Sequence, residues 1–353
     1  MKKEYYHASG IIHVHSTYSD GTRSIPEIAR ISNELDIQFV LMTDHNTIQP
    51  KLDGLEGWYD KILLGIGCEL NDEEDENHYL AFDIDEEIKE TDPDTYVCLV
   101  REQGGFGIIA HPDESRSHIP KYRAYPWKIW DSECYDGIEI WNQMSEWMEG
   151  LTTKNKYFRV LHPRRSIITP KAETLKKWDK ISMDRKLVGI GGVDAHGHKY
   201  KILGLFPYTV FRYKISFKTI RTHVLMDYPL EKGQDYKKGL ANIFNAIKQA
   251  HCFVSHYYFG DASDFRFLAE NKDTVVIMGD SIILDEKAKL IVQNPVKAET
   301  YLVRNGEYVE SHLAKDIEFA IDRTGVYRIE THVEKRPWIM SNHIRVTDNN
   351  GQI

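Results

Sequence analysis

The first 260 residues alternate between short apolar runs and longer segments with a helical period. Seven runs are continuously apolar and β-branched, which is typical of strands covered on both faces. After the first run, residues 24–37 predict a helix, with Ser24 as its cap, Pro26 in its first turn and Glu27 at the capping-box position. The seven predicted strands cover residues 10–16, 38–45, 62–70, 78–84, 105–112, 136–142 and 187–196.

Strands that alternate with helices indicate an α/β fold with a parallel sheet. Seven such strands within about 200 residues favour a barrel, although an open doubly wound sheet has the same local pattern. Beyond residue 260 the chain changes to short strands separated by turn signals, with Asn305-Gly306 as a tight hairpin turn. This pattern predicts a small β-sandwich. We therefore expect two domains, residues 1–270 and 271–353.

Composition and charge narrow the functional classes. The 45 Lys and Arg residues against 54 Asp and Glu residues give a net charge of −9, and no apolar run comes near the ~18 residues of a membrane span. The N-terminus has no apolar segment behind its two lysines, so we expect a cytoplasmic protein without a membrane partner. Nucleic acid is not an expected partner either, because the chain is acidic and shows no basic stripe with interleaved aromatic residues.

Two further features of composition bear on the chemistry. The four cysteines, Cys68, Cys98, Cys134 and Cys252, are scattered and form no C-x-x-C pair. This favours unpaired thiols in a reducing compartment and argues against a cysteine-based zinc site. The acidic run at residues 71–77 predicts a solvated loop, with recruitment of cations as the alternative.

Histidine and carboxylate residues fall at the ends of the predicted strands. His13 and His15 lie two residues apart, so their side chains leave a strand on the same face and can hold one ion. Asp194 and His196 repeat this spacing at the seventh strand. In a parallel barrel, the carboxyl ends of all strands open on one rim, where active sites lie. The other candidates at strand ends are Asp20, Asp44, His45, Glu69, His78 and His111.

A single buried histidine is usually a core residue with satisfied hydrogen bonds. Six histidines and four acids that converge on one rim are different, because their burial is costly unless metal ions or hydrogen bonds compensate it. Imidazole and carboxylate ligands without thiolate suit zinc, manganese or iron. The pattern therefore predicts a metal centre.

Five motifs resemble those of the PHP (polymerase and histidinol phosphatase) domain in order and approximate spacing. They are HVHSTYSDG at residues 13–21, TDHN at 43–46, the segment 69–78, AHPD at 110–113 and GGVDAH at 191–196. The resemblance covers about residues 10 to 200. It implies a distorted (β/α)7 TIM-like barrel that holds two or three divalent metal ions (Zn, Mn or Fe).

The resemblance also implies the ligands of each ion. They are His13, His15, Glu69 and Asp194 for the first ion, Glu69, His78 and His111 for the second, and Asp20, His45 and His196 for the third. Asp44 is then expected to orient His45 or a neighbouring imidazole. The segment 242–258 and the predicted C-terminal immunoglobulin-like β-sandwich resemble the PHP subgroup that includes carbaryl hydrolase relatives (CehA/McbA-like).

The expected activity is that of a metal-dependent phosphoesterase acting on a small phosphomonoester or cyclic phosphodiester. Divalent ions lower the pKa of a bound water to about 7 and neutralise charge on the substrate oxygens. Asp194 and His196 are the candidates for moving the proton. The alternative is a carboxyl or carbamate ester hydrolase with the same metal site, which a neutral, aromatic pocket would favour. A third hypothesis is a metal-stabilised scaffold without catalysis.

Substrate contacts are expected after the strand that ends at His111. Arg116, and more weakly Lys121 and Arg123, are candidates for binding phosphate oxygens, and Lys199 has a similar claim. The aromatic residues there are Tyr122, Tyr125, Trp127, Trp130, Trp141 and Trp147, for which core packing is favoured over a pocket. Residues not expected to be ligands are His118, His162, His198, His251, His256, His312, His332 and His343.

Overall fold

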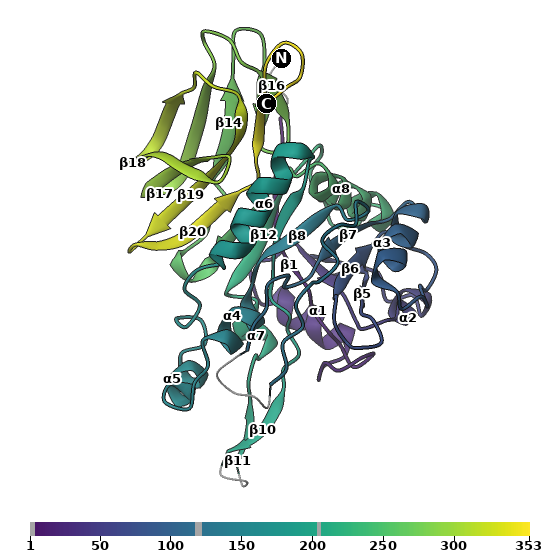
Figure 1. Ribbon diagram of the computed structural model, residues 1–353. Helices are drawn as coiled ribbons and strands as arrows, with labels where there is room; N and C mark the ends of the chain where they lie inside the picture. The colour runs from purple at the N-terminus through teal and green to yellow at the C-terminus, as the bar shows by residue number, and fades with distance from the viewer. Residues whose placement is uncertain (1–3, 117–121, 203–205) are drawn as a thin grey trace.

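The structure is a computed structural model that describes residues 4–116, 122–202 and 206–353 (Figure 1). The chain is mixed α/β, and within the described residues its larger sheet comprises 14 strands. All seven predicted strands form. They are β1 (Tyr6–Ile12), β2 (Phe39–Met42), β4 (Ile62–Ile66) with its continuation β5 (Cys68–Leu70), β6 (Tyr79–Phe82), β7 (Phe106–Ile109), β8 (Gly137–Asn142) and β9 (Val188–Gly192).

The hydrogen bonds of these strands follow a closed path. β1 pairs with β2 and β2 with β4, all parallel. The second run continues from β5 through β6, β7 and β8 to β9. A bridge between His45 and Glu69 joins the β2 side to β5. At the other end, Val193 N–H donates to the Ile12 carbonyl and His15 N–H to the Ala195 carbonyl, which brings β9 back to β1.

The expectation of a uniformly parallel sheet is wrong at β6. This strand is antiparallel to both of its neighbours, β5 and β7. Residues 71–78, which join β5 to β6, contain no helix, so the chain turns back directly instead of crossing over. The amino end of β6 therefore lies at the rim where the other strands of the path have their carboxyl ends.

Helices surround this path. The predicted first helix is α1 (Ile25–Asn33), where the Glu27 carboxylate accepts from the Ser24 N–H and hydroxyl. None of the helices in the described parts of the chain is long and apolar enough to cross a membrane. The others are α2 (Gln49–Leu52), α3 (Pro93–Glu102), α4 (Gln143–Glu149), α5 (Lys156–Leu161), α6 (Ala172–Asp184), α7 (Tyr213–Ser216), α8 (Tyr236–Lys248) and the short 3-10 helix Tyr257–Phe259.

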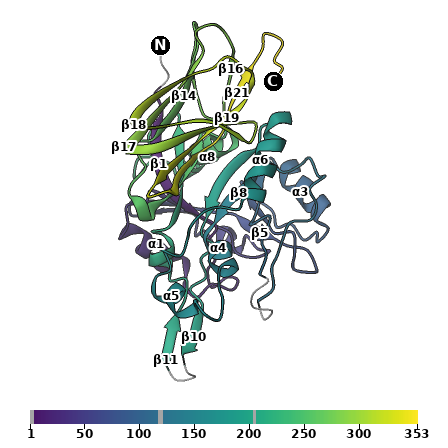
Figure 2. The same ribbon diagram turned by 60° about the vertical axis from the view of Figure 1, so that its left-hand side comes forward.

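The strands that were not predicted include β3 (Gly57–Tyr59), which pairs with β4, and the hairpin of β10 (Lys199–Ile202) and β11 (Phe206–Thr209). Figures 1 and 2 show this hairpin and α5 projecting at the same end of the molecule, below α4.

The sheet continues from β1 into the C-terminal half of the chain. β1 pairs with β12 (Ile220–Met226), β12 with β13 (Cys252–His256), and β13 with β20, all antiparallel. Asn305 and Gly306 have φ of 51° and 86° and join β17 to β18, so the predicted hairpin turn is confirmed. The C-terminal strands are β14 (Arg266–Glu270), β15 (Val275–Ile277), β16 (Ser281–Ile283), β17 (Lys289–Arg304), β18 (Glu307–Ala320), β19 (Gly325–Val333), β20 (Arg336–Ser341) and β21 (Ile344–Thr347).

These strands have a hydrophobic core of their own, in which Phe267 of β14 packs with Trp338 and Ile339 of β20. Leu225 and Phe253 of β12 and β13 join the same core, so it lies against the strands that extend from β1. The division of the chain at residue 270 stays a prediction.

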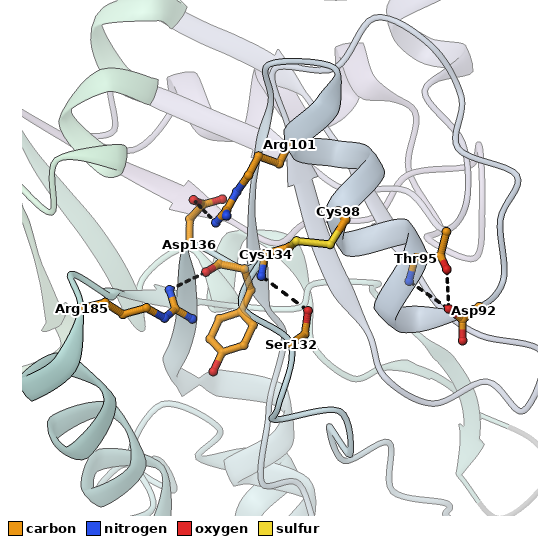
Figure 3. The surroundings of a disulfide bond; sticks show 9 residues. Asp92, Thr95, Cys98, Arg101, Ser132, Cys134, Asp136 and Arg185 are labelled. Atoms are coloured by element: carbon orange, nitrogen blue, oxygen red, sulfur yellow. Dashed lines mark hydrogen bonds and ion pairs between the residues drawn. A yellow bond between two sulfur atoms is a disulfide. The ribbon is translucent and has the colours of Figure 1, made fainter.

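The prediction of four unpaired cysteines is wrong for two of them. Cys98 of α3 and Cys134 form a disulfide (Figure 3), whereas Cys68 and Cys252 are buried thiols. The pairing was missed because the two residues are 36 positions apart and meet only through the packing of α3 against the end of the β7–β8 connection. The cysteines therefore no longer support a reducing compartment. The disulfide anchors the connection that carries Arg116 and Tyr125.

Candidate metal centre

The predicted ligands meet at one rim of the closed strand path. His13 follows β1, His45 follows β2, His111 follows β7 and Asp194 follows β9. His78 precedes β6, and it reaches the same rim because β6 runs in the opposite direction. Strands far apart in sequence thus deliver their side chains to one place.

Glu69 of β5 is the centre of this arrangement. One of its carboxylate oxygens lies 3.0 Å from the Nε2 atoms of both His13 and His15. The other lies 2.8 Å from His78 Nδ1 and 3.3 Å from His111 Nε2. Glu69 itself is buried. A single carboxylate therefore contacts four imidazoles from three different segments.

Three overlapping groups of side chains offer ligand atoms that all lie within 4.8 Å of one another. Two of the groups share Glu69, and the group around Asp20 shares His15 with one and His45 with the other. The groups are His13, His15, Glu69 and Asp194; His45, Glu69 and His78; and His15, Asp20, His45 and His196. Eight of the nine predicted ligands therefore belong to these groups. The ninth, His111, lies outside the groups but contacts Glu69.

Unpaired buried nitrogens show that the residues fit metal ions. Both ring nitrogens of His15, His45 Nδ1, His78 Nε2 and His111 Nδ1 are buried and form no hydrogen bond among the described residues. A buried polar atom without a partner costs roughly 1–3 kcal/mol. Such cost is relieved when an imidazole lone pair binds an ion, and imidazole with carboxylate suits zinc, manganese or iron.

The carboxylates of the centre perturb the histidines strongly. Burial alone would lower the pKa of His15, but the nearby carboxylates of Asp194 and Glu69 raise the pKa to about 9. Burial would also lower the pKa of His78, but the Glu69 carboxylate outweighs this effect and raises the pKa to about 10. Burial would raise the pKa values of Glu69 and Asp194, yet the facing imidazoles hold both well below their usual range. The protein thus holds ionised carboxylates here that require positive charge.

The third group lies closer to solvent. Asp20 is about half exposed, and its carboxylate lies 3.1 Å from His196 Nε2 and 3.6 Å from His15 Nδ1. The rings of His15 and His196 stack with centroids 4.0 Å apart. His196 Nδ1 lies 3.4 Å from the Asp194 carboxylate. His196 therefore connects the buried group around Asp194 with the exposed group around Asp20.

Glu139 of β8 is an orienting residue that the sequence did not single out. Its carboxylate lies 3.1 Å from His13 Nδ1 and accepts hydrogen bonds from His111 N–H and Asn142 Nδ2. A carboxylate behind a ligand histidine fixes the ring and raises its basicity. Gly192 permits the contact, because a Cβ at this position would lie 1.7 Å from a Glu139 oxygen.

Three predicted ligands have a strained backbone. His13, His111 and Asp194 have φ of 69°, 27° and 52°, in the region that non-glycine residues rarely adopt. Such conformations gather at functional sites, where surrounding structure maintains them. The sequence pattern does not predict these φ angles.

The expectation for Asp44 is wrong. Its carboxylate accepts hydrogen bonds from the Ser16 N–H, the Ser16 hydroxyl and the Ser19 hydroxyl, and so fixes the turn that follows His15. It does not orient His45, because the short Ser16–Ser19 turn brings hydroxyl and amide donors closer to it. The acidic loop 71–77 is only partly solvated: Asp72 is buried, and Asp75 lies 3.5 Å from His78 Nε2.

A cavity of about 590 Å³ opens over the centre. Its lining includes metal-ligand candidates together with Ser19 and Asp75. The remaining lining residues are larger side chains: Arg116, Tyr122, Tyr125, Met144, Met148, His198 and Phe211. The aromatic residues therefore divide between two roles, since Trp127, Trp141 and Trp147 are buried in the core whereas Tyr122 and Tyr125 face the cavity.

The predicted substrate contacts also divide. Arg116 lines the cavity, with its Nη2 2.5 Å from the buried Glu114 carboxylate and its guanidinium over the Tyr125 ring. Arg123 contacts Glu76 instead, and Lys199 is exposed at the start of β10, outside the described lining. Lys121 and His118 lie outside the described residues.

The histidines that were not expected to be ligands have other surroundings. His198 lines the cavity and stacks on His196, whereas His251 and His343 pair with Asp280 and Asp179. His332 lies near Glu330 and His312 near Glu310. None of the residues set aside belongs to a described group of possible metal ligands.

Comparisons with known proteins add little. No family model matches the chain. An uncharacterized protein of Methanocaldococcus jannaschii is 28% identical over 145 residues, which are 37% of this chain and 80% of that protein. A solved two-domain protein from Bacteroides vulgatus, described as containing a predicted PHP-like metal-dependent phosphoesterase, covers 96% of this chain and 95% of its own at 13% identity and a TM-score of 0.47. An amidohydrolase from Chromobacterium violaceum covers 53% of this chain and 87% of its own at 14% identity and a TM-score of 0.32. Both TM-scores lie below 0.5.

Proposed function

We propose that the protein is a metal-dependent phosphoesterase of the PHP type, which hydrolyses a small phosphomonoester or cyclic phosphodiester. The observation that carries the proposal is the sharing of His15, His45 and Glu69 among three ligand groups at the base of an open cavity. Shared ligands place two or three ions next to one another, as two-metal hydrolases require. With this function we assign the closed strand path to a distorted (β/α)7 barrel and the C-terminal strands to an immunoglobulin-like β-sandwich.

The residues present would hold two or three divalent ions, with Zn, Mn and Fe as the candidates. His13, His15, Glu69 and Asp194 would hold the first, and His45, Asp20 and His196 the most exposed one. Glu69, His78 and His111 would hold the remaining ion. When bound, adjacent ions lower the pKa of a water to about 7 and neutralise charge on the substrate oxygens.

The chain's own groups position the reaction and move its proton. His196 links Asp194, 3.4 Å from its Nδ1, to Asp20, 3.1 Å from its Nε2. This row leads from the buried centre toward solvent, because Asp20 is half exposed. Asp194 and His196 are therefore the groups to accept the proton of the attacking water and pass it outward. Glu139 keeps His13 in place from behind.

The distribution of charge supports an anionic substrate. Residues 150–172 and 195–226 together contain 12 Lys and Arg residues and no Asp or Glu, in a chain whose net charge is −9. These segments include α5 and the β10–β11 hairpin, which flank α4 and project at the same end in both views (Figures 1 and 2). Lys154, Lys156 and Arg165 are exposed there. A positive surface raises the encounter rate with an anion such as a phosphoester.

A carboxyl or carbamate ester hydrolase is the second candidate, and one observation favours it. Arg116 is the only lysine or arginine among the described residues lining the cavity, and the buried Glu114 compensates its charge. The wall away from the ions is therefore neutral. A neutral wall does not reject an uncharged ester, so both chemistries must be tested side by side.

The test is hydrolysis of a matched panel of a phosphomonoester, a phosphodiester and a carboxyl ester by protein reconstituted with Mn. Metal-dependent phosphate release supports the phosphoesterase. Ester turnover without phosphate release assigns the second candidate, and a metal-loaded protein silent on all three overturns both. Arg116→Lys, which keeps the charge but removes the planar donor set, separates a phosphate contact from a structural role.

A further inference from the structure

Helix α4 contributes to the wall of the cavity through two of its side chains. This helix follows β8 directly, and Asn142 caps it by accepting a hydrogen bond from Ser145 N–H. The same Asn142 side chain donates to Glu139, the carboxylate that lies behind His13. The position of α4 is therefore fixed relative to the candidate metal centre by a short chain of hydrogen bonds.

Met144 and Met148 present the cavity-facing side of α4. They are one helical turn apart, so their side chains lie on the same face, and both line the cavity while staying partly exposed. Phe211 extends this surface from the segment after β11. Its ring packs edge-to-face on Trp147 of α4, with centroids 4.9 Å apart. Two thioethers and a phenyl ring thus form one continuous apolar wall.

The polar residues of α4 are not among the described residues that line this cavity. Glu146 accepts a hydrogen bond from Trp141 Nε1 at 2.7 Å and another from Thr169 N–H. Gln143 accepts from the Thr219 hydroxyl. In the described lining, α4 is therefore represented only by its two methionines.

The cavity consequently has two chemically different kinds of lining. The ligand groups supply imidazoles and carboxylates, and their ions would hold the charged, hydrolysable group. Met144, Met148 and Phe211 supply apolar surface, and the charge of Arg116 is neutralised by Glu114. A second phosphate would find no free cation on this wall among the described residues. The volume of about 590 Å³ lies within the range of sites that enclose a small organic ligand.

We propose that Met144, Met148 and Phe211 form a binding site for an apolar group, so that the substrate is an amphiphilic ester with its acid group at the ions and an aryl or alkyl alcohol on this wall. This inference rests on the proposed function for the identity of the acid group. Methionine side chains are flexible and polarisable, so the site accepts rings and chains of differing shape.

The experiment measures selectivity and binding separately. For hydrolysis, the ratio of kcat/KM for 1-naphthyl phosphate to that for glycerol 2-phosphate is compared between the parent and Met148→Gln. Each substrate is compared with itself across variants, so differences in leaving-group acidity cancel. We expect this ratio to fall about tenfold in Met148→Gln and to recover in Met148→Leu, since one apolar contact is worth about 10- to 200-fold. Met183→Gln, a half-buried methionine of α6 outside the cavity, is the matched control and leaves the ratio unchanged.

Binding of 1-naphthol, followed by its fluorescence in the Asp194→Ala protein, gives a readout that needs no catalysis. If the double variant Asp194→Ala/Met148→Gln binds naphthol more weakly than Asp194→Ala does, the apolar site is supported even when no phosphoester is hydrolysed. Failure of the proposed function is thereby distinguished from failure of the apolar site. A parent protein that does not bind naphthol overturns the proposal. An equal change of the selectivity ratio in Met148→Gln and Met183→Gln overturns it as well.

Discussion

The candidate metal centre and the network around Arg328 are both buried clusters of carboxylates and imidazoles, but their polar atoms are satisfied differently. In the Arg328 network, the guanidinium of β19 donates to both oxygens of Asp179 of α6, at 2.7 and 2.9 Å. It also donates to Glu330 at 2.6 Å. His343 Nε2 lies 2.7 Å from Asp179, and the Tyr308 hydroxyl donates to Glu330.

The metal centre has no arginine or lysine in such a position among the described residues. In this part of the chain only histidines are ion-paired with Glu69 and Asp194, and several imidazole nitrogens have no hydrogen bond. Buried carboxylates are stable only with a partner charge. The Arg328 network contains a permanent cation and joins α6 to the C-terminal strands, whereas the centre around Glu69 has only imidazoles to offset its carboxylates, and imidazoles can release their protons to bind metal ions.

The largest expected effect concerns catalysis at the metal centre. Asp194→Ala removes a carboxylate shared by His13, His15 and His196. We expect kcat/KM of the metal-reconstituted protein to fall at least about 100-fold, because even residues behind metal ligands are worth 10- to 100-fold. Asp322→Ala, which removes an exposed aspartate beyond the C-terminal core, is the control. Parent-like turnover in Asp194→Ala would contradict the assignment.

The next effect separates structure from function. Asp179→Asn leaves the buried Arg328 without its bidentate partner, so the free energy of unfolding should fall by about 3 to 5 kcal/mol. Urea unfolding measures this change, and metal content should stay at the parent value. A loss below about 1 kcal/mol, as for a surface ion pair, would show that the network is not the structural cluster described here.

Glu139→Gln tests whether a carboxylate behind the candidate ligands contributes to metal binding. The amide keeps the size of the side chain but loses the charge facing His13, 3.1 Å away. We expect metal affinity, measured by competition with a chelator, to fall about 10- to 100-fold. Glu133→Gln, at an exposed position of the connection that precedes β8, is the control and should bind metal as the parent does. Equal affinity in Glu139→Gln would remove its orienting role.

The smallest effect is a pH dependence of the Arg328 network. Burial opposes ionisation of Asp179, but the Arg328 guanidinium outweighs it and lowers the pKa to about 2. An unfolded aspartate has a pKa of about 3.9, so this stabilisation is complete above pH ~4 and is lost as the pH falls toward 2. The difference in unfolding free energy between the parent and Asp179→Asn should be constant near neutrality and shrink below pH ~4. A difference that persists unchanged at pH ~2.5 would contradict the lowered pKa.

The sequence predicted the strands of the closed path because continuous apolar runs carry a strong signal, as in β2 and β9. It missed the reversed direction of β6, which depends on the loop at residues 71–78 turning back without a helix. It also missed the disulfide between Cys98 and Cys134, since a pairing over 36 positions is decided by packing and not by local spacing.

The candidate ligands were predictable because they follow or precede strands, which are local features. The strand alternation expected for His13 and His15 is wrong, because β1 ends at Ile12 and His13 has φ of 69°. Glu139 was not predictable in this way, since its role depends on Gly192 leaving room for its carboxylate. The apolar wall was equally hidden: Met144 and Met148 have helical spacing typical of any core face. Only the position of α4 beside Phe211 shows that this face lines a cavity.

The most direct measurement of the central claim is the number of metal ions per chain, determined by elemental analysis of the parent and of Glu69→Gln. Glu69 belongs to two of the three ligand groups. We predict two or three ions in the parent and at most one in Glu69→Gln. A parent that binds fewer than two ions, or a Glu69→Gln protein that retains all of them, would contradict the metal centre.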